Sequence, residues 1–242
     1  MQAFIEAAID ANQEIAAFLR QNEDDSLFYP DGRIGYGGDR SLKIDLIAEE
    51  IFIKRLGGFG RINSEECGPI GEGKDEIVID PIDGSANIAS GFPYYGASVA
   101  LKSGVKAAAS VVCNLANGDY FVKRRDETYR SNLYDPKKLP LERALKPQAG
   151  FFEKAYSHPK LAKALNKNGF KFRSPGALAL SLAYAHGASF VAAAGAPREY
   201  DIIAGLHLCE DLHIFRNEKL ILVSADQTIF ERLKSVFIEG EL

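Results

Sequence analysis

The sequence predicts a mixed α/β protein in which helices and strands alternate. Two observations support this fold class. The first half contains apolar and β-branched runs joined by short polar turns such as Ser103-Gly104 and Asn117-Gly118, which is the pattern of β-hairpins. After a proline-containing stretch at residues 135–147, short apolar runs alternate with helical patterns, as in layered α/β proteins. We therefore expect two subdomains, 1–145 and 146–242, that meet near Leu145.

The N-terminal half begins with two predicted helices. Residues 3–19 form an amphipathic pattern, and residues 41–56 follow helical spacing until Gly57-Gly58 ends the helix. A loop rich in Asp, Gly and Tyr separates the two helices at residues 22–39, and we expect it to be mobile. The predicted strands of this half are 61–64, 76–80, 94–102, 107–114, 119–123 and 128–130.

The second half is predicted to alternate between strands and helices. Strands are expected near Phe151, at 170–172, from Ser189 and at 219–223, and helices at 159–168, from Gly176, at 201–212 and at 227–237. Residues between Arg173 and Arg198 lack fixed charge over a length that could span a bilayer. Proline, serine and glycine interrupt this weakly hydrophobic stretch, which favours a buried helix, a turn and a buried strand, and no membrane contact is expected.

Composition limits the classes of function. The 242 residues are 46% hydrophobic and 26% charged, which is enough for a sizeable core and excludes a disordered chain. The net charge is −4, and no basic cluster is denser than Lys123-Arg124-Arg125, so we expect no nucleic-acid partner. Three scattered cysteines, Cys67, Cys113 and Cys209, favour reduced thiols over a disulfide framework. Without an export signal in the N-terminal helix, these features predict a cytoplasmic protein.

The segment from Glu76 to Ser85 is the most informative part of the chain. An apolar strand ends at Asp80, Pro81 is expected to stop the strand, and Gly84 permits an unusual φ before a new helix. Asp80 and Asp83 are therefore held three residues apart, and no Lys or Arg occurs between residues 76 and 101. Because like charges at close range are costly without a cation, the pattern predicts a metal site.

The type of ligand indicates which metal and substrate would bind there. The motif offers oxygen ligands and neither His nor Cys, which favours Mg²⁺ over zinc. Gly84 and Ser85 offer backbone N–H groups that could bind an anion such as phosphate. An ordinary acidic turn with Ser85 as an N-cap explains the same residues without any ligand, and the motif alone leaves both interpretations open.

The longer segment DPIDGSANIASGFPYYGASVAL, residues 80–101, resembles the signature of the inositol monophosphatase family. Three further pieces occur in the family's order: Lys43-Ile44-Asp45, Ser64-Glu65-Glu66 and the segment from Tyr200 to Gly205. This family belongs with fructose-1,6-bisphosphatase among lithium-sensitive, Mg²⁺-dependent phosphomonoesterases. The resemblance implies an alternating αβαβα sandwich, usually in a homodimer, and a small phosphorylated sugar or inositol as substrate.

The resemblance also implies roles for individual residues. The implied metal ligands are Glu65, Asp80, the Ile82 carbonyl, Asp83 and Asp201, which would hold two or three Mg²⁺ ions. Ser85 stands where the family usually has Thr, and with Asp45 and Glu65 it forms the implied catalytic set that activates water. The residues expected to contact the substrate are Asp83, Gly84, Ser85, Arg198 and Asp201.

Departures from the family pattern leave the substrate open. Ala194 lies seven residues before Asp201, where relatives that cleave inositol phosphates often have Glu, so fructose 1,6-bisphosphate is the main alternative substrate. Arg198 could contact a sugar hydroxyl or a second phosphate, or be an ordinary solvated arginine. The glycine-rich loop could act as a lid in which Asp39 helps to hold a third ion. A metal-binding scaffold that has lost catalysis is the alternative of another class.

A few weaker candidates remain beside these. Glu66 is the substitute ligand if the register shifts by one residue. In the glycine-rich loop, Arg33 or Arg40 could contact the substrate, although a plain flexible loop explains these residues equally well.

Overall fold

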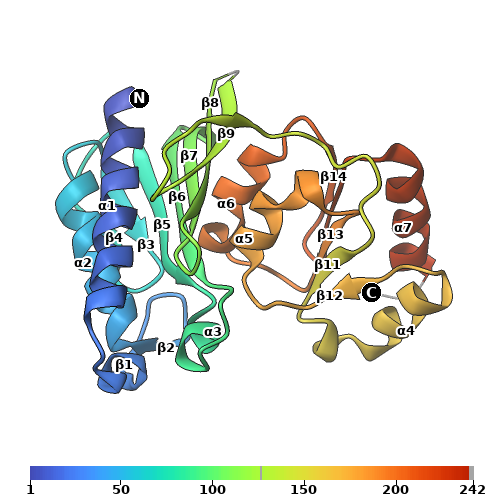
Figure 1. Ribbon diagram of the computed structural model, residues 1–242, viewed down its shortest axis with the longest axis horizontal. Coiled ribbons are helices and arrows are strands. Elements are labelled where there is room, and N and C mark those ends of the chain that lie inside the picture. Colours follow the sequence, from blue (N-terminus) through green and yellow to red (C-terminus); the bar gives the residue numbers. More distant parts are fainter. Residues whose placement is uncertain (126, 240–242) are drawn as a thin grey trace.

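The computed structural model describes residues 1–125 and 127–239. Its helices and sheets are stacked in five layers, in the order helices, sheet, helices, sheet, helices (Figure 1). The αβαβα sandwich implied by the family resemblance is therefore confirmed.

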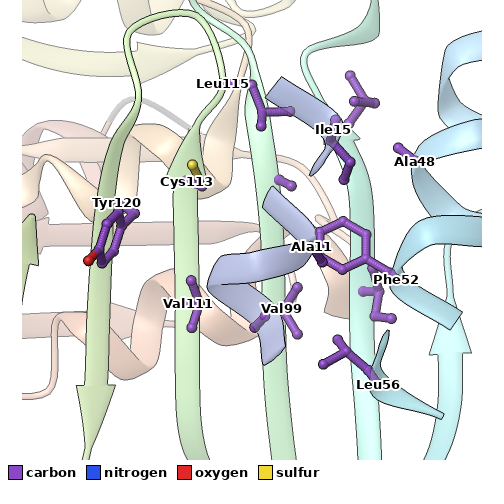
Figure 2. Packing of buried hydrophobic residues seen from close by; sticks show 14 of the residues in the cluster. Ala11, Ile15, Ala48, Phe52, Leu56, Val99, Val111, Cys113, Leu115 and Tyr120 are labelled. Carbon is purple, nitrogen blue, oxygen red and sulfur yellow. The ribbon is translucent and has the colours of Figure 1, made fainter. Parts of the chain in front are cut away.

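The first two layers are a helix pair and an eight-stranded sheet. α1 (Gln2–Gln21) and α2 (Lys43–Leu56) cover one face of this sheet, whose strand order is β10-β9-β8-β7-β6-β5-β3-β4. Figure 2 shows side chains of both helices, among them Ile15 and Phe52, packed over Val99 and Val111 of the sheet. The strands are β3 (Arg61–Ser64), β4 (Gly68–Ile70), β5 (Glu76–Asp83), β6 (Gly96–Ser103), β7 (Lys106–Asn114), β8 (Asp119–Arg124), β9 (Glu127–Asn132) and β10 (Leu139–Pro140).

The middle layer is formed by α5 (Leu178–Ala183) and α6 (Glu199–Leu208), which lie between the two sheets. Leu180 packs on the large sheet beside Phe121, while Leu182 packs on the small sheet beside Val191. Because α5 and α6 bury apolar side chains on both sides, they join the two sheets into one core. This layer also brings residues from the last third of the chain to the C-terminal end of β5.

The last two layers are a five-stranded sheet, with the order β12-β11-β13-β15-β14, and two helices that cover its outer face. The strands are β11 (Gly150–Glu153), β12 (Phe172–Arg173), β13 (Val191–Ala194), β14 (His213–Arg216) and β15 (Leu220–Ser224). The covering helices are α4 (Pro159–Lys167) and α7 (Gln227–Glu239). The remaining short elements are η1 (Asp25–Phe28), β1 (Pro30–Ile34), β2 (Arg40–Leu42), α3 (Ser85–Ala89), η2 (Ala155–Ser157) and η3 (Ala185–Gly187).

Several boundaries differ from the sequence predictions. The strand expected to stop at Asp80 continues through Pro81 to Asp83, because an irregularity in its pairing with β6 accommodates the proline. The helix expected at 201–212 ends at Leu208 and a turn follows at residues 209–212. Residues 213–216 form β14, a strand that was not predicted. The expected loop at 22–39 contains η1 and β1, which pairs with β2 in a hairpin.

The uncharged stretch between Arg173 and Arg198 forms α5, η3 and β13, as expected. In the described parts of the chain, no helix is both long enough and apolar enough to cross a bilayer. The predicted subdomain boundary near Leu145 falls between β10 of the large sheet and β11 of the small one. The division into two subdomains stays a prediction.

Candidate metal centre

Two parallel strands bring the first acids together at one edge of the large sheet. β3 and β5 are parallel neighbours, with Ser64 paired to Ile79, so Glu65, which follows β3, lies beside Asp80 of β5. The backbone N–H of Glu65 donates to the Ile79 carbonyl at 3.1 Å, which fixes this arrangement. Because carboxyl ends of parallel strands meet at the same edge, residues that are 15 positions apart in the sequence become neighbours.

The third acid arrives from α6. Asp201 lies in the first turn of that helix, and its Oδ2 accepts a hydrogen bond from the Arg198 backbone N–H at 3.1 Å. This bond satisfies a free N–H group at the helix start and fixes the Asp201 side chain. Glu65, Asp80 and Asp201 each offer a carboxylate oxygen, and these oxygens lie within 4.8 Å of one another. The structure thus gathers three of the four predicted acidic ligands into one trio.

The trio is suited to a cation. Asp80 is 2% exposed, and its Oδ1 is buried without a hydrogen-bond partner. Burial raises the pKa of Asp80 well above its usual range, and the nearby charges of Glu65 and Asp83 add to the effect. Burial likewise raises the pKa of Glu65 to about 7. Buried carboxylates with an unpartnered oxygen are costly unless a cation is bound, and oxygen-only ligands fit Mg²⁺.

The other two predicted ligands lie next to the trio. Asp83 is buried, and its Oδ2 accepts a hydrogen bond from the Leu180 backbone N–H of α5 at 3.0 Å. Burial raises the pKa of Asp83 well above its usual range, although this hydrogen bond opposes the shift. The carbonyl of Ile82 accepts a hydrogen bond from the Ser85 hydroxyl at 3.1 Å. The roles of Asp83 and Ile82 as metal ligands stay predictions.

Ser85 and Asp45 form a pair beside these acids. The Ser85 hydroxyl lies 3.2 Å from Asp45 Oδ1, and Asp45 Oδ2 accepts the Leu42 backbone N–H at 2.7 Å. Burial raises the pKa of Asp45 to about 7. Gly84 adopts φ +93° between Asp83 and Ser85, a conformation that favours glycine. The geometry therefore brings together a hydroxyl and a carboxylate able to accept a proton near neutral pH.

Arg198 lies within this acidic centre, where its guanidinium forms ion pairs with Glu65 at 2.6 Å, Asp39 at 2.8 Å and Asp201 at 3.2 Å. The sequence left open whether Arg198 is a solvated arginine, and these ion pairs show that its guanidinium is held by acids. Its expected role in substrate binding stays a prediction.

Two further acids flank the centre. Glu66, considered above as the substitute ligand, is half-buried and accepts a hydrogen bond from the Ser41 hydroxyl. Glu153 ends β11, is buried, and accepts hydrogen bonds from the Gly176 backbone N–H at 2.8 Å and from the Ser181 hydroxyl. Glu153 was not predicted from the sequence, although it ends an apolar strand.

Fold and site together define a layered α/β protein with a candidate metal centre where β3 and β5 of the large sheet meet α6. The model of the inositol monophosphatase family matches residues 1–212, and the chain belongs to that family. A Pyrococcus furiosus fructose-1,6-bisphosphatase is 28% identical over 163 residues, which cover 64% of this chain and 61% of that protein. The match therefore spans less than two thirds of this relative's length.

A further relative and a solved structure are also similar to this chain. A Xylella fastidiosa protein named Nus factor SuhB is 28% identical over 192 residues, covering 74% of this chain and 67% of that protein. The solved structure of a Thermotoga maritima IMPase superposes with a TM-score of 0.77 at 18% identity over 98% of each chain. At this level of identity, the structural likeness shows the fold alone.

Proposed function

We propose that this chain is a Mg²⁺-dependent phosphomonoesterase that hydrolyses a small sugar or cyclitol phosphate. The observation that carries the proposal is the convergence of Glu65, Asp80 and Asp201, with Asp80 Oδ1 buried and unpartnered. Family membership and the name of the Pyrococcus furiosus relative support the same reaction class.

Each acid has a proposed task. Glu65, Asp80 and Asp201 would hold Mg²⁺, with Asp83 and the Ile82 carbonyl completing the ligands for two or three ions. When bound, Mg²⁺ would lower the pKa of a water molecule and neutralise charge on the phosphoryl oxygens.

The Ser85 and Asp45 pair would orient the attacking water. A water that donates a hydrogen bond to Ser85 Oγ can transfer its proton through the hydroxyl to Asp45, whose pKa of about 7 suits this task near neutral pH. Glu65, the third member of the implied catalytic set, would help to activate the same water. The water oxygen forms the new P–O bond, the ester P–O bond breaks, and the leaving alkoxide takes up a proton to give an alcohol and inorganic phosphate. No covalent phosphoenzyme is formed.

The proposed substrate contacts surround this pair. Backbone N–H groups of Gly84 and Ser85 would bind phosphoryl oxygens, while Asp83 and Asp201 would accept hydrogen bonds from substrate hydroxyls. Inositol 1-phosphate is the first candidate substrate.

Fructose 1,6-bisphosphate is the second candidate, and two residues favour it. Ala194 ends β13 and supplies no carboxylate to bind an inositol hydroxyl. Once released from its acids, Arg198 could bind the second phosphate of this substrate, because a guanidinium binds phosphate through two parallel hydrogen bonds.

A panel of phosphate esters with Mg²⁺ tests the proposal. We expect phosphate release from inositol 1-phosphate, fructose 1,6-bisphosphate or a related ester, loss of nearly all turnover in Asp83→Asn, and inhibition by Li⁺. Turnover that survives both a chelator and Asp83→Asn would refute the mechanism. No turnover with any ester would favour the non-catalytic scaffold, an alternative kept open by the relative named Nus factor SuhB.

We also propose a cytoplasmic homodimer without a nucleic-acid partner. The three cysteines are free thiols in the structure, which supports a reducing compartment. The net charge of −4 supports the absence of a nucleic-acid surface. The homodimer follows from the family resemblance, and light scattering of the purified protein tests it.

A further inference from the structure

The guanidinium of Arg198 makes five polar contacts, as many as it has N–H donors. Nη2 lies 2.6 Å from Glu65 Oε1 and 3.3 Å from Asp201 Oδ1, and Nε lies 3.2 Å from Asp201 Oδ2. Nη1 donates to Asp39 Oδ2 at 2.8 Å and to the Gly37 carbonyl at 3.0 Å. Each N–H donor of the guanidinium therefore has an acceptor in this arrangement.

Two of these partners, Glu65 and Asp201, belong to the trio that could hold a divalent ion. Within residues 1–125 and 127–239, no other basic side chain forms an ion pair with Glu65, Asp80, Asp83 or Asp201. Arg198 therefore supplies the positive charge that pairs with Glu65 and Asp201. A divalent ion on the same carboxylates would repel the guanidinium at short range, so the two cations compete.

Arg198 also links the acidic centre to the β1–β2 hairpin through its contacts with Gly37 and Asp39. The tip of the hairpin is fixed by two backbone hydrogen bonds, from Tyr36 N–H to the Glu66 carbonyl at 2.9 Å and from Gly37 N–H to the Glu65 carbonyl at 2.7 Å. Asp39 is mostly exposed, and its one ion pair within the described residues is with Arg198. When the guanidinium leaves, the tip loses the contacts that Asp39 and the Gly37 carbonyl make with Arg198.

We propose that Arg198 is a resident counter-ion that a divalent cation displaces from Glu65 and Asp201, and that this displacement loosens the tip of the β1–β2 hairpin, residues 35–40. The inference rests on the proposed function, because the competing ion is the Mg²⁺ assigned there. Arg198 thus competes with Mg²⁺ for the same carboxylates and lowers the affinity of the site for the metal. The displacement also frees a guanidinium beside the site at the moment the metal is loaded.

Calorimetric titration of the chelator-treated protein with Mg²⁺ alone tests the competition. Arg198→Gln should bind Mg²⁺ more tightly than the wild type, by on the order of tenfold, which is typical of coupling between linked sites. Arg55→Gln is the matched control, because Arg55 also pairs with two acids, Glu14 and Asp10, but on the outer surface of α2. This control should bind Mg²⁺ as the wild type does.

Hydrogen exchange at residues 35–40 tests the coupling to the hairpin. In the wild type, Mg²⁺ should increase exchange at these amides. In Arg198→Gln, exchange should be high without Mg²⁺ and change little on its addition. If this variant folds poorly, Arg198→Lys keeps the charge without the fork and should give an intermediate Mg²⁺ affinity.

Equal or weaker Mg²⁺ binding by both Arg198 variants would overturn the inference. If that result came with Mg²⁺-dependent turnover that Asp83→Asn abolishes, the proposed function would stand without it. A wild-type protein that binds no Mg²⁺ would overturn both.

Discussion

The buried carboxyl groups of Asp45 and Glu65 favour their protonated forms. Their ordinary pKa values of 3.8 and 4.5 rise to about 7 in the folded chain, mainly because burial penalises the charged form. Between about pH 4 and pH 7 the folded chain therefore binds more protons than the unfolded chain, and these two groups lower stability as the pH rises through that window. Without a metal, both groups exert their full penalty above about pH 7.

This linkage predicts the pH dependence of unfolding. With a chelator present, the free energy of unfolding should fall from pH 5 to pH 8 more steeply in the wild type than in Asp45→Asn/Glu65→Gln, which lacks both titrating groups. Urea unfolding of the two proteins at each pH measures the difference. Saturating Mg²⁺ should reduce the slope in the wild type. Parallel stability profiles for the two proteins would contradict the assignment.

Ser85 tests the proposed orientation of the water. Ser85→Ala removes the hydroxyl that links Asp45 Oδ1 to the Ile82 carbonyl, and kcat should fall by about 100-fold, as is typical of a lost acid–base contribution. Ser85→Thr keeps the hydroxyl and should retain most of the turnover. Steady-state kinetics on the best ester of the panel measure both variants, and equal activity of Ser85→Ala and the wild type would exclude the role of this hydroxyl.

At the scale of elements, the β1–β2 hairpin approaches the acids closely because residue 37 is glycine. A Cβ at this position would lie 2.8 Å from Arg198 Nη1 and 2.8 Å from Glu65 Cγ. Gly37→Ala should therefore displace either the hairpin tip or these two side chains. A misplacement of this kind in a catalytic site lowers kcat/KM by roughly 10- to 100-fold.

Gly58→Ala is the control for this prediction. Gly58 follows α2, and a Cβ there would meet nothing within 4 Å. We expect wild-type kcat/KM in Gly58→Ala and a clear loss in Gly37→Ala, with similar urea midpoints for the two. Unchanged kinetics in Gly37→Ala would show that the hairpin tip has no part in the site.

Local patterns predicted most elements, and the errors have identifiable physical causes. The hairpins at Ser103-Gly104 and Asn117-Gly118 join β6 to β7 and β7 to β8, because turn residues act locally. The end of β5 was mispredicted because an irregularity in the pairing allows Pro81, which has no N–H to donate, to remain within the strand. The end of α6 was mispredicted because Cys209 and Leu212, in the turn that follows the helix, are buried and continue its apolar pattern.

At the scale of the whole molecule, the site depends on contacts that no local pattern contains. Asp83 and Leu180 are 97 positions apart and share a hydrogen bond, since α5 is pressed between the two sheets. The family resemblance predicts Asp201 as a ligand, but its approach to Asp80 follows from the packing of α6 against β5. The ion pairs of Arg198 with Glu65 and Asp201 could not be predicted, because the same packing of α6 determines where the Arg198 side chain lies.

The layered architecture thus brings Glu65, Asp80 and Asp201 together at the C-terminal end of β5. A crystal structure with Mn²⁺, a divalent ion that can be located by its anomalous scattering, tests this meeting most directly. We predict an anomalous peak in contact with carboxylate oxygens of all three residues. Saturating Mn²⁺ that leaves no peak between these carboxylates would contradict the account.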